Sequence, residues 1–562
     1  MTSPTTTADP RRWIAFAVVL AAGFMDLLDV TIVNVAVPSI QSDLRAEYSQ
    51  IEWIIAAYVL AFAAVLITGG RLGDIYGRKR VFLLGMAGFT LASAACGLAT
   101  DPDVLIAARF AQGAMGGLMV PQILAIIQTT FPKEERAKAI AVYSGVGGSA
   151  SAVGLALGGI LVQADLFGLG WRTIFLVNIP VGIAAFVAAW FVMSDSKSPA
   201  APRLDPVGMV LAMAAVLLLV FPLAEGRRLG WPAWTFAMMA AAAGVFVAFL
   251  FYERSLTRAG RSPLVDLGLF RSRPFAVGLG SWLLFWIGMG GFFLVWTLFM
   301  QAGLGWTPMR AGLTAVFFAV GAGVGAGVSV GVLAARFGRR VLIIGALINA
   351  AGFGIYGAMA VRYGSEFASW QMVLPLIVTG AGFGMVVAPT IDLLLGQVPL
   401  REAGSASGLL NTGQQLGTAL GVALVGVLFF TVLDHDSDRG VAEVTPQIRA
   451  ELAADGVPVS AQDQIVAGFG ACVGARSAQA DPTVVPDSCL PPTNLPGGDE
   501  VSRLLADAGA EANAVNFAET FRYTLYYGMG ILLLVCLGFF ALPKEAKLEQ
   551  RPLDPEPEIV TV

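Results

Sequence analysis

Long apolar runs separated by short polar segments dominate this chain. An α-helix of about 20 apolar residues crosses the roughly 30 Å hydrocarbon layer of a membrane and satisfies its own backbone hydrogen bonds there. We therefore predict an all-α polytopic membrane protein with fourteen membrane-spanning helices. They are expected at residues 13–38, 53–70, 81–99, 104–130, 138–162, 171–193, 206–224, 233–252, 275–301, 309–335, 341–361, 371–396, 403–432 and 521–542.

The composition agrees with this pattern. Of 562 residues, 56% are hydrophobic and 13% are charged, and the mean hydropathy is +0.74, whereas soluble domains carry about 25% charged residues. The sequence has no G-x-x-x-x-G-K-[ST] phosphate-binding motif and no cluster of metal-ligating residues, and a G-x-G-x-x-G match means little among 66 glycines. We therefore predict neither an enzyme nor a metal site. We also expect the first helix to be an uncleaved span.

The distribution of lysine and arginine predicts the orientation. If the amino terminus lies inside, the inner segments hold 23 of the 35 basic residues and the short outer loops hold four. Positive side chains favour the cytoplasmic side of a membrane, so both termini are expected in the cytoplasm. Arg227 and Arg228, in a predicted outer loop, go against this bias.

The one long connection, residues 433–520, is then expected outside, with 14 acidic and four basic residues. It contains Cys472 and Cys489, a candidate disulfide in a compartment where disulfides form; two free thiols are the alternative. The only histidine, His435, follows Asp434 and is better explained as part of a solvated acidic turn than as a metal ligand.

An internal repeat divides the chain. The stretch GRLGDIYGRKR begins at Gly70, and a degraded copy, GVLAARFGRR, begins 261 positions later at Gly331. The predicted order is a tail (1–12), a six-helix bundle (13–193), two inserted helices with a linker (194–274), a second six-helix bundle (275–542) and a tail (543–562). Parallel repeats of this kind are typical of transporters that alternate around a site near the membrane midplane.

Four motifs carry a family resemblance. They are G-x-L-x-D-x-x-G-R-K-R from Gly70, A-R-F-A-Q-G around Arg109, G-L-A-L-G-G from Gly154 and L-D-V-T-I-V-N-V-A-V-P from Leu28. Together they resemble the motif set of the major facilitator superfamily, and with fourteen spans they are similar to its drug/proton antiporter branch. The chain has Leu155 where that branch usually has a proline.

The resemblance implies a multi-pass bacterial plasma-membrane protein that exports hydrophobic or cationic small molecules in exchange for protons by alternating access. It implies no cofactor, since the proton gradient would drive transport. Expected partners are the small-molecule substrate, protons and membrane lipids, with no nucleic acid, and the functional unit is expected to be a monomer. Two alternatives remain: an exporter of a lipid or endogenous metabolite, and a proton-coupled importer of a nutrient on the same fold.

Charged residues within the spans are the candidates for proton coupling, because such residues are costly in a membrane. Asp29 and Arg109 are expected at similar depth, so they could pair, and Gln112 shares a helix face with Arg109. The alternative for Arg109 is a side chain that extends to the interface. Asp26 and Asn34 fit one polar arc with Asp29, expected to face a cavity between the bundles, where Asp26 could share a proton with Asp29.

Further candidates concern the substrate cavity, the gate and the helix interfaces. Aromatic and methionine side chains recur at steps of three or four and could line the cavity, although contact with lipid or packing within the bundle is the more frequent explanation of such a stripe. The loop motif is interpreted as a cytoplasmic gate, and the glycines, by the resemblance, as close-approach positions between bundles. The cavity candidates are Trp282, Trp286, Met289, Phe293 and Trp296, with Asn34 and Gln112; the gate residues are Gly70, Asp74, Gly77 and Arg78; the interface glycines are Gly154, Gly158 and Gly159.

Overall fold

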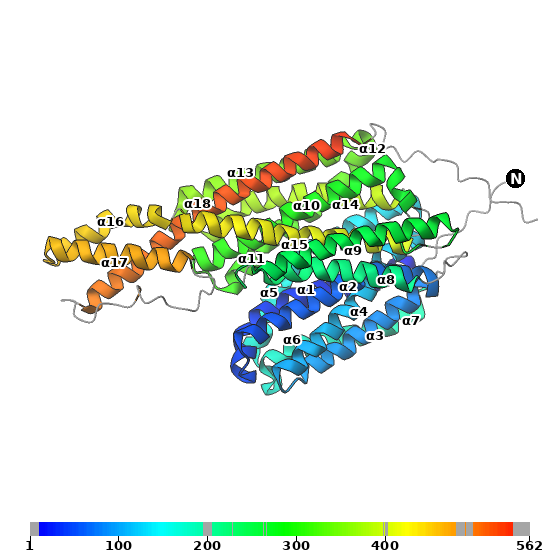
Figure 1. Ribbon diagram of the computed structural model, residues 1–562, viewed down its shortest axis with the longest axis horizontal. Helices are drawn as coiled ribbons and strands as arrows, with labels where there is room; N and C mark the ends of the chain where they lie inside the picture. The colour runs from blue at the N-terminus through cyan, green and yellow to red at the C-terminus, as the bar shows by residue number, and fades with distance from the viewer. Residues whose placement is uncertain are drawn as a thin grey trace, which may run out of the picture.

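The computed structural model describes residues 11–194, 205–226, 229–261, 263–265, 267–396, 398, 403–435, 437–478, 489 and 498–542. Its helices form two bundles that lie side by side with their axes roughly parallel (Figure 1). The first bundle contains α1 (Arg12–Leu44), α2 (Tyr48–Tyr76), α3 (Arg78–Gly97), α4 (Pro102–Thr130), α5 (Lys133–Ala164), α6 (Thr173–Leu176) and α7 (Asn178–Val192).

The second bundle follows two further helices, α8 (Pro206–Glu225) and α9 (Ala233–Arg258). These inserted helices pack on α2 and α15 through two small apolar clusters that include Ile67 and Leu60 of α2. The second bundle contains α10 (Arg273–Leu298), α11 (Pro308–Val328), α12 (Ala334–Phe337), α13 (Arg340–Tyr363), α14 (Val373–Gly396), α15 (Ala403–His435) and α18 (Gly498–Phe540).

Local sequence explains where helices begin and turn. At the start of α4, the Asp101 carboxylate accepts hydrogen bonds from the backbone N–H groups of Asp103 (3.1 Å) and Val104 (3.0 Å), and Pro102 takes the first position, which needs no N–H donor. Between α2 and α3, Gly77 adopts φ 104°, a conformation that side-chain-bearing residues rarely take. Gly77 of the repeated motif therefore permits the turn between these two helices.

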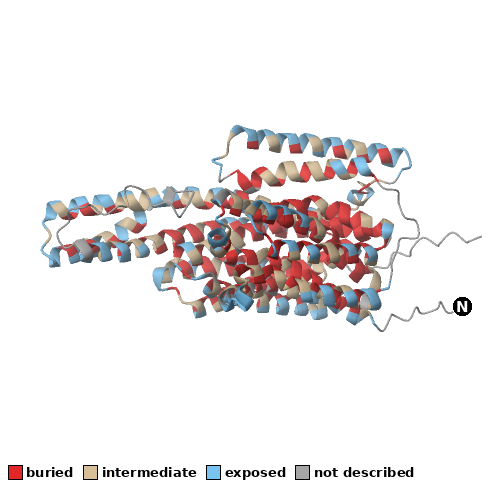
Figure 2. Ribbon diagram, turned by 90° about the horizontal axis from the view of Figure 1, so that it is seen from below, coloured by how far each residue is buried: buried red, intermediate tan, exposed pale blue. Residues whose placement is uncertain are grey.

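Thirteen segments in the described part of the chain are long and apolar enough to cross a membrane. This confirms the polytopic all-α fold. The thirteen overlap every predicted span except 138–162, which corresponds to α5, a helix of 32 residues. Fourteen spans therefore stays a prediction. Buried residues concentrate inside the two bundles, while the helices that project beyond them are mostly exposed (Figure 2).

The long acidic connection folds as helices, which corrects its description as a loop. α16 (Ser437–Ala454), α17 (Val459–Ala478) and the first part of α18 project beyond the bundles (Figure 1) and share an apolar core. Three residues of that core, Val444, Ile448 and Leu452, are spaced four apart, which is the helical period that the sequence interpretation overlooked. The last helix therefore begins at Gly498 and not near 521.

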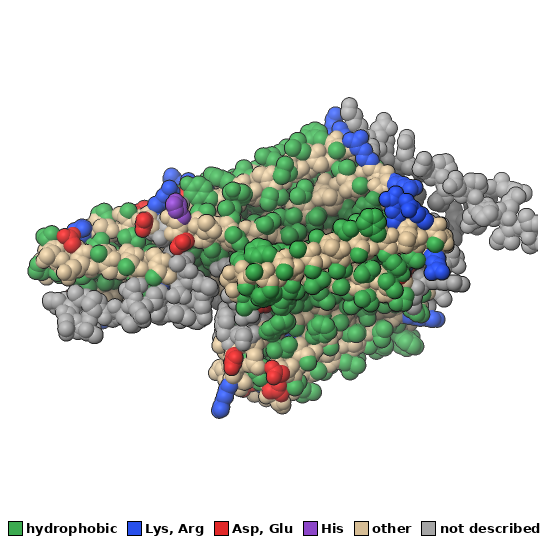
Figure 3. All heavy atoms as spheres, in the orientation of Figure 1, with side chains coloured by type: hydrophobic (Ala, Val, Ile, Leu, Met, Phe, Trp, Pro, Cys, Tyr) green, Lys and Arg blue, Asp and Glu red, His purple; other side chains and the backbone are tan. Residues whose placement is uncertain are grey.

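Basic residues gather at one end of the bundles and acidic residues at the other (Figure 3). We name the basic end as the one at which α2, α9, α12 and α18 finish. The Arg12 guanidinium pairs there with Glu135 (2.8 Å), and Arg339 donates a hydrogen bond to the carbonyl of Phe540 (2.8 Å). The start of α1 and the finish of α18 thus lie at the same end, which we predict to be cytoplasmic. The opposite end, with α16 and α17, is the acidic end.

Candidate functional site

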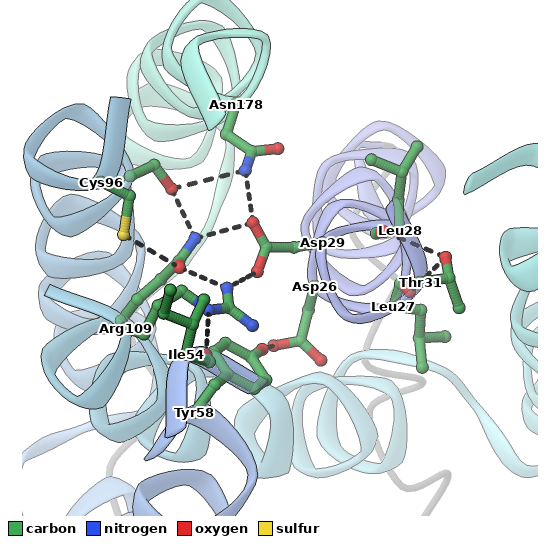
Figure 4. Close-up of polar contacts among 12 residues, drawn as sticks. Asp26, Leu27, Leu28, Asp29, Thr31, Ile54, Tyr58, Cys96, Arg109 and Asn178 are labelled. Carbon is green, nitrogen blue, oxygen red and sulfur yellow. Dashed lines mark hydrogen bonds and ion pairs between the residues drawn. The ribbon is translucent and has the colours of Figure 1, made fainter. Parts of the chain in front are cut away.

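A buried ion pair lies inside the first bundle. Asp29 on α1 accepts a hydrogen bond from Arg109 on α4 (Figure 4), and their side chains are 0% and 2% exposed. The other carboxylate oxygen of Asp29 accepts from Gln112 Nε2 at 2.8 Å and from Asn178 Nδ2 at 2.9 Å. Removing charges from water is expensive unless they are paired and fully hydrogen-bonded. The polar groups of α4 and α7 around Asp29 meet this condition.

Arg109 is held from several sides. Its Nη1 also donates to Gln112 Oε1 (2.6 Å), and its Nε donates to the carbonyl of Ile54 (3.2 Å). The guanidinium carbon lies 4.2 Å from the centre of the Tyr58 ring and 5.7 Å from that of Phe175, both within the range of a cation–π contact. These contacts exclude the alternative in which the side chain extends to the interface.

Ser93 and Asn178 extend this network, and the sequence analysis did not single out either of them. Ser93 Oγ accepts from Gln112 Nε2 at 2.8 Å and from Asn178 Nδ2 at 3.4 Å. Both residues are at most 1% exposed. Their positions within the apolar runs 81–99 and 171–193 could have pointed to them, because a polar side chain buried in an apolar helix needs a hydrogen-bond partner.

Asp26 has a different partner from Asp29. It accepts a hydrogen bond of 2.6 Å from the Tyr58 hydroxyl, and it is 3% exposed. A Cβ atom on Gly116 would lie 2.7 Å from Asp26 Oδ1, so glycine leaves room for the carboxyl group. Tyr58 and Arg109 connect the two acids, because the Tyr58 hydroxyl binds Asp26 while its ring covers the guanidinium. The sharing of one proton between Asp26 and Asp29 stays a prediction.

The expected polar arc facing a cavity between the bundles is corrected. Asp29 points into the first bundle, toward α4 and α7, because its partners Arg109, Gln112 and Asn178 lie on these helices. Ser93 of α3 is on the same side, since it bonds Gln112. The side chain of Asn34 lies outside the described residues. Helical angles predict which residues share one face of a helix, but they do not predict which neighbouring helix packs against that face.

The aromatic stripe on α10 forms part of the packed interior of the second bundle, where a cavity lining was expected. Trp282, Trp286, Met289 and Trp296 are at most 9% exposed, while Phe293 is half-buried. Trp282 Nε1 donates to the carbonyl of Leu410 (3.0 Å). A side-chain repeat of three or four marks the face that packs, whether or not a ligand is present.

The repeated motif binds the second bundle at the basic end, and we call the contact of Asp74 with Gly404 and Ser405 the basic-end clasp. Asp74 on α2 accepts hydrogen bonds from the backbone N–H groups of Gly404 (3.0 Å) and Ser405 (2.9 Å), in the first turn of α15. A carboxylate is favourable there because the first turn of a helix presents free N–H donors and partial positive charge. Arg78 Nη2 donates to Asp74 Oδ1 at 2.8 Å, and both side chains are at most 3% exposed. Gly70 packs directly on the backbone of Gly404.

Two further hydrogen bonds join the bundles near the same end. Gln128 Nε2 on α4 donates to the carbonyl of Leu395 at 2.6 Å, and Ser407 Oγ on α15 donates to the carbonyl of Pro121. Each bond links a helix of one bundle to a helix of the other. The structure is therefore closed between the bundles at the basic end.

The glycines of α5 have two different neighbours. A Cβ atom on Gly154 would lie 3.1 Å from Thr31 Cβ of α1, within the first bundle, so its expected place between bundles is corrected. Gly145, nine residues earlier and not in the predicted set, faces Gly323 of α11 in the other bundle: a Cβ atom on Gly145 would lie 3.6 Å from Gly323 Cα. Gly158 is buried, and Gly159 lies outside the residues whose side chains are described.

Cys472 and Cys489 form a disulfide at the acidic end, with Cα atoms 4.6 Å apart. His435 closes α15 and precedes the helical region. Among the described residues, no group of three or more His, Cys, Asp or Glu side chains is arranged to hold a metal ion.

Comparison with known proteins identifies the family. Residues 19–422 match the family model described as Major Facilitator Superfamily. The chain belongs to the major facilitator superfamily. It is therefore a transporter and not an enzyme, and a multi-pass protein of the plasma membrane.

The chain is similar to bacterial export proteins of this superfamily. It is 40% identical to the probable actinorhodin transporter of Streptomyces coelicolor over 545 residues, which cover 96% of this chain and 93% of the relative. It is 36% identical to the tetracenomycin C resistance and export protein of Streptomyces glaucescens over 452 residues, 79% of this chain and 81% of the relative. These relatives of the major facilitator protein are thus named for transport of actinorhodin and for resistance to and export of tetracenomycin C.

The solved structure of the human organic anion transporter MFSD10 supports the fold. It matches with a TM-score of 0.53 at 14% identity and covers 95% of this chain and 100% of its own. At this identity, the similarity concerns the fold alone.

Proposed function

We propose that this major facilitator protein is a proton-coupled antiporter that exports hydrophobic or cationic small molecules. The observation that carries the proposal is the buried pair of Asp29 and Arg109, because an ionisable pair that is fully enclosed among apolar helices is costly and is typical of proton relays. Export by the relatives at 40% and 36% identity supports the direction of transport and an antibiotic-like substrate.

Asp29 is proposed as the proton acceptor. Protonation would remove its charge and weaken its bond with Arg109, which cannot lose its own proton. Arg109 would then keep its bonds to Gln112 and Ile54, but its positive charge would be uncompensated. A proton and a cationic guest would therefore compete for the same negative charge, which is the condition for exchange.

Alternating access is proposed to use the clasp at the basic end. The structure is closed there through Asp74 and the first turn of α15. Opening toward the cytoplasm would separate these groups and expose the substrate path to the inside. The membrane potential adds about 2.3 kcal/mol per charge per 100 mV, so the proton gradient could drive export without ATP or a cofactor. The proposed functional unit is a monomer.

The test is proton release driven by substrate in energised inverted vesicles. Wild-type protein is expected to release protons when a panel of antibiotics is added, and Asp29→Asn is expected to release none. Asp438→Asn, an exposed acid on α16, is the matched control and should behave as wild type. Substrate-driven proton release that persists in Asp29→Asn would remove Asp29 from the mechanism.

A second candidate function rests on the acidic end. α16 and α18 enclose a groove of about 360 Å³. An exporter of a lipid or metabolite that delivers its cargo to a partner outside the membrane would use such a projecting region. The groove is lined by Gln447, Glu451, Ala454, Asp455, Glu500, Arg503, Leu504, Asp507, Ala508 and Glu511.

A further inference from the structure

Two carboxyl groups meet beneath the inserted helices, far in sequence from Asp29. Asp205 precedes α8 and Glu253 lies near the finish of α9; they are 5% and 0% exposed. One oxygen of each is fully bonded: Asp205 Oδ1 accepts from Gly208 N and from the Tyr252 hydroxyl, both at 3.0 Å, and Glu253 Oε2 accepts from Val265 N at 3.2 Å.

The second oxygen of each acid is buried without a hydrogen-bond donor. These oxygens are Asp205 Oδ2 and Glu253 Oε1. Both border the small space beside Gly208, where a Cβ atom would lie 2.5 Å from Glu253 Oε1 and against Asp205 Oδ2. Two carboxylates that face one another in an apolar site cannot both be charged at acceptable cost, and one proton shared between them supplies the missing donor.

Among the residues that the structure describes, few charges around the pair could replace this proton. The adjoining apolar cluster contains Ile67, Ala212, Phe249, Leu264 and Val265. Tyr252 from α9 already donates to Asp205. Among nearby cations, Arg71 of α2 directs its guanidinium to the carbonyl of Pro263 (2.5 Å), and Arg254, Arg258 and Arg261 are exposed. A bound proton is therefore the occupant that fits the two facing oxygens.

The same carboxyl pair is connected to the closure between the bundles. Val265, which donates to Glu253, belongs to a short linker segment, Pro263–Val265. Arg71 of the first bundle bonds Pro263, and Ser405 of the second bundle donates to the carbonyl of Leu264 at 3.5 Å. Ser405 is also one of the two residues whose N–H binds Asp74. Glu253 thus helps to fix a segment that contacts both bundles where they close.

We propose that Asp205 and Glu253 form a second proton-binding site, which holds one proton between their facing oxygens while the basic end is closed. Loss of that proton leaves two facing carboxylates whose repulsion separates α8 from α9 and releases Val265 from Glu253. The linker segment then loses its hydrogen bonds with Arg71 and Ser405, and this loss favours opening of the basic end. The site makes closure depend on pH at that end, independently of Asp29.

Infrared difference spectroscopy tests the bound proton. The full chain in lipid nanodiscs is titrated over about pH 4 to 9, the range around carboxyl titration, and the carbonyl stretch of protonated carboxyl groups is followed. Glu253→Gln and Asp205→Asn keep the shape of each side chain and supply an amide donor to the facing oxygen. Each variant is expected to lose the same band, while Asp29→Asn and the exposed control Glu500→Gln retain it. A band that survives in both amide variants overturns the proposal.

Spin-label distances test the link to closure. Tyr76→Cys and Phe337→Cys place labels on exposed positions of the two bundles at the basic end, and the native cysteines are buried or in the disulfide. In the otherwise wild-type chain, rising pH is expected to shift the population toward longer distances. Glu253→Gln and Asp205→Asn should each reduce that shift at least fivefold and keep the short distance, whereas Glu500→Gln should not. An unchanged pH response in both amide variants overturns the link.

Discussion

The Tyr58 ring covers the Arg109 guanidinium at 4.2 Å, while the hydroxyl of that ring donates to Asp26. One side chain therefore contacts Asp26 directly and Asp29 through Arg109. A cation–π contact in a desolvated site is worth about 2 kcal/mol, and a buried acceptor left without its donor costs about 1–3 kcal/mol. The ring and the hydroxyl can be separated experimentally because different variants remove them.

We predict that Tyr58→Phe, which keeps the ring and removes the hydroxyl, lowers thermal stability by about 1–3 kcal/mol and alters the pH profile of transport through Asp26. Tyr58→Leu removes both contacts and should be less stable than Tyr58→Phe. Thermal unfolding in detergent and transport measured against pH check this. Equal stability of the two variants would show that the ring contributes nothing to holding Arg109.

The losses of stability caused by substitutions at Asp29 and at Arg109 should be strongly non-additive. Asp29→Asn leaves the Arg109 charge buried without its anion, so we predict a loss of about 3–5 kcal/mol. Arg109→Gln in addition removes that charge and should restore much of the stability, but not the coupling to protons. Thermal unfolding of the single and double variants, read as a double-mutant cycle, measures the interaction. Additive losses would contradict a tight pair.

The sequence predicted this pair because charges are rare in apolar runs and because helix length fixes depth. It could not predict Asn178 or Tyr58 as partners, since lateral neighbours depend on how helices pack. The motif from Gly70 predicted a gate, but the partner of Asp74, the first turn of α15, is 330 residues away and has no sequence motif of its own. The helices at the acidic end were overlooked because their apolar positions are too few for a membrane span.

Close backbone contact at the basic end predicts sensitivity at Gly404. A Cβ atom there would lie 2.7 Å from Asp74 Oδ1 and against the Gly70 carbonyl. We predict that Gly404→Ala opens the basic end and lengthens the distance between spin labels on Tyr76→Cys and Phe337→Cys. Gly280→Ala is the control, because the space beside Gly280 is open. An unchanged spin-label distance in Gly404→Ala would show that the contact is not needed for closure.

The contacts of Asp43 with Trp171 and Arg172, at the acidic end of the first bundle, predict that local structure there depends on pH. Hydrogen bonds from Arg172 (2.5 Å) and Trp171 Nε1 (3.0 Å) lower the pKa of Asp43. A depressed folded pKa gives stability that is present above the unfolded value, about 3.9, and is lost as pH falls through the folded value. Acidification below about pH 4 should therefore change tryptophan fluorescence. Asp43→Asn should lack that transition, and its persistence there would assign it to another acid.

The projecting helices at the acidic end can be removed with little strain. Gly440 N donates to Asn516 Oδ1 at 2.9 Å, so the two ends of the region are adjacent. Deletion of residues 440–515, with a short glycine linker, should leave the bundles folded.

If the protein exports small molecules directly, we expect this deletion to retain at least half of wild-type antibiotic transport in vesicles, because the Asp29 network and the basic-end clasp lie in the bundles. Cys472→Ser with Cys489→Ser is the milder companion, which opens the disulfide and keeps the helices. Loss of transport in the deletion, with normal folding by size-exclusion chromatography and retained proton release, would favour delivery to an external partner. The groove between α16 and α18 would then be the surface to mutate next.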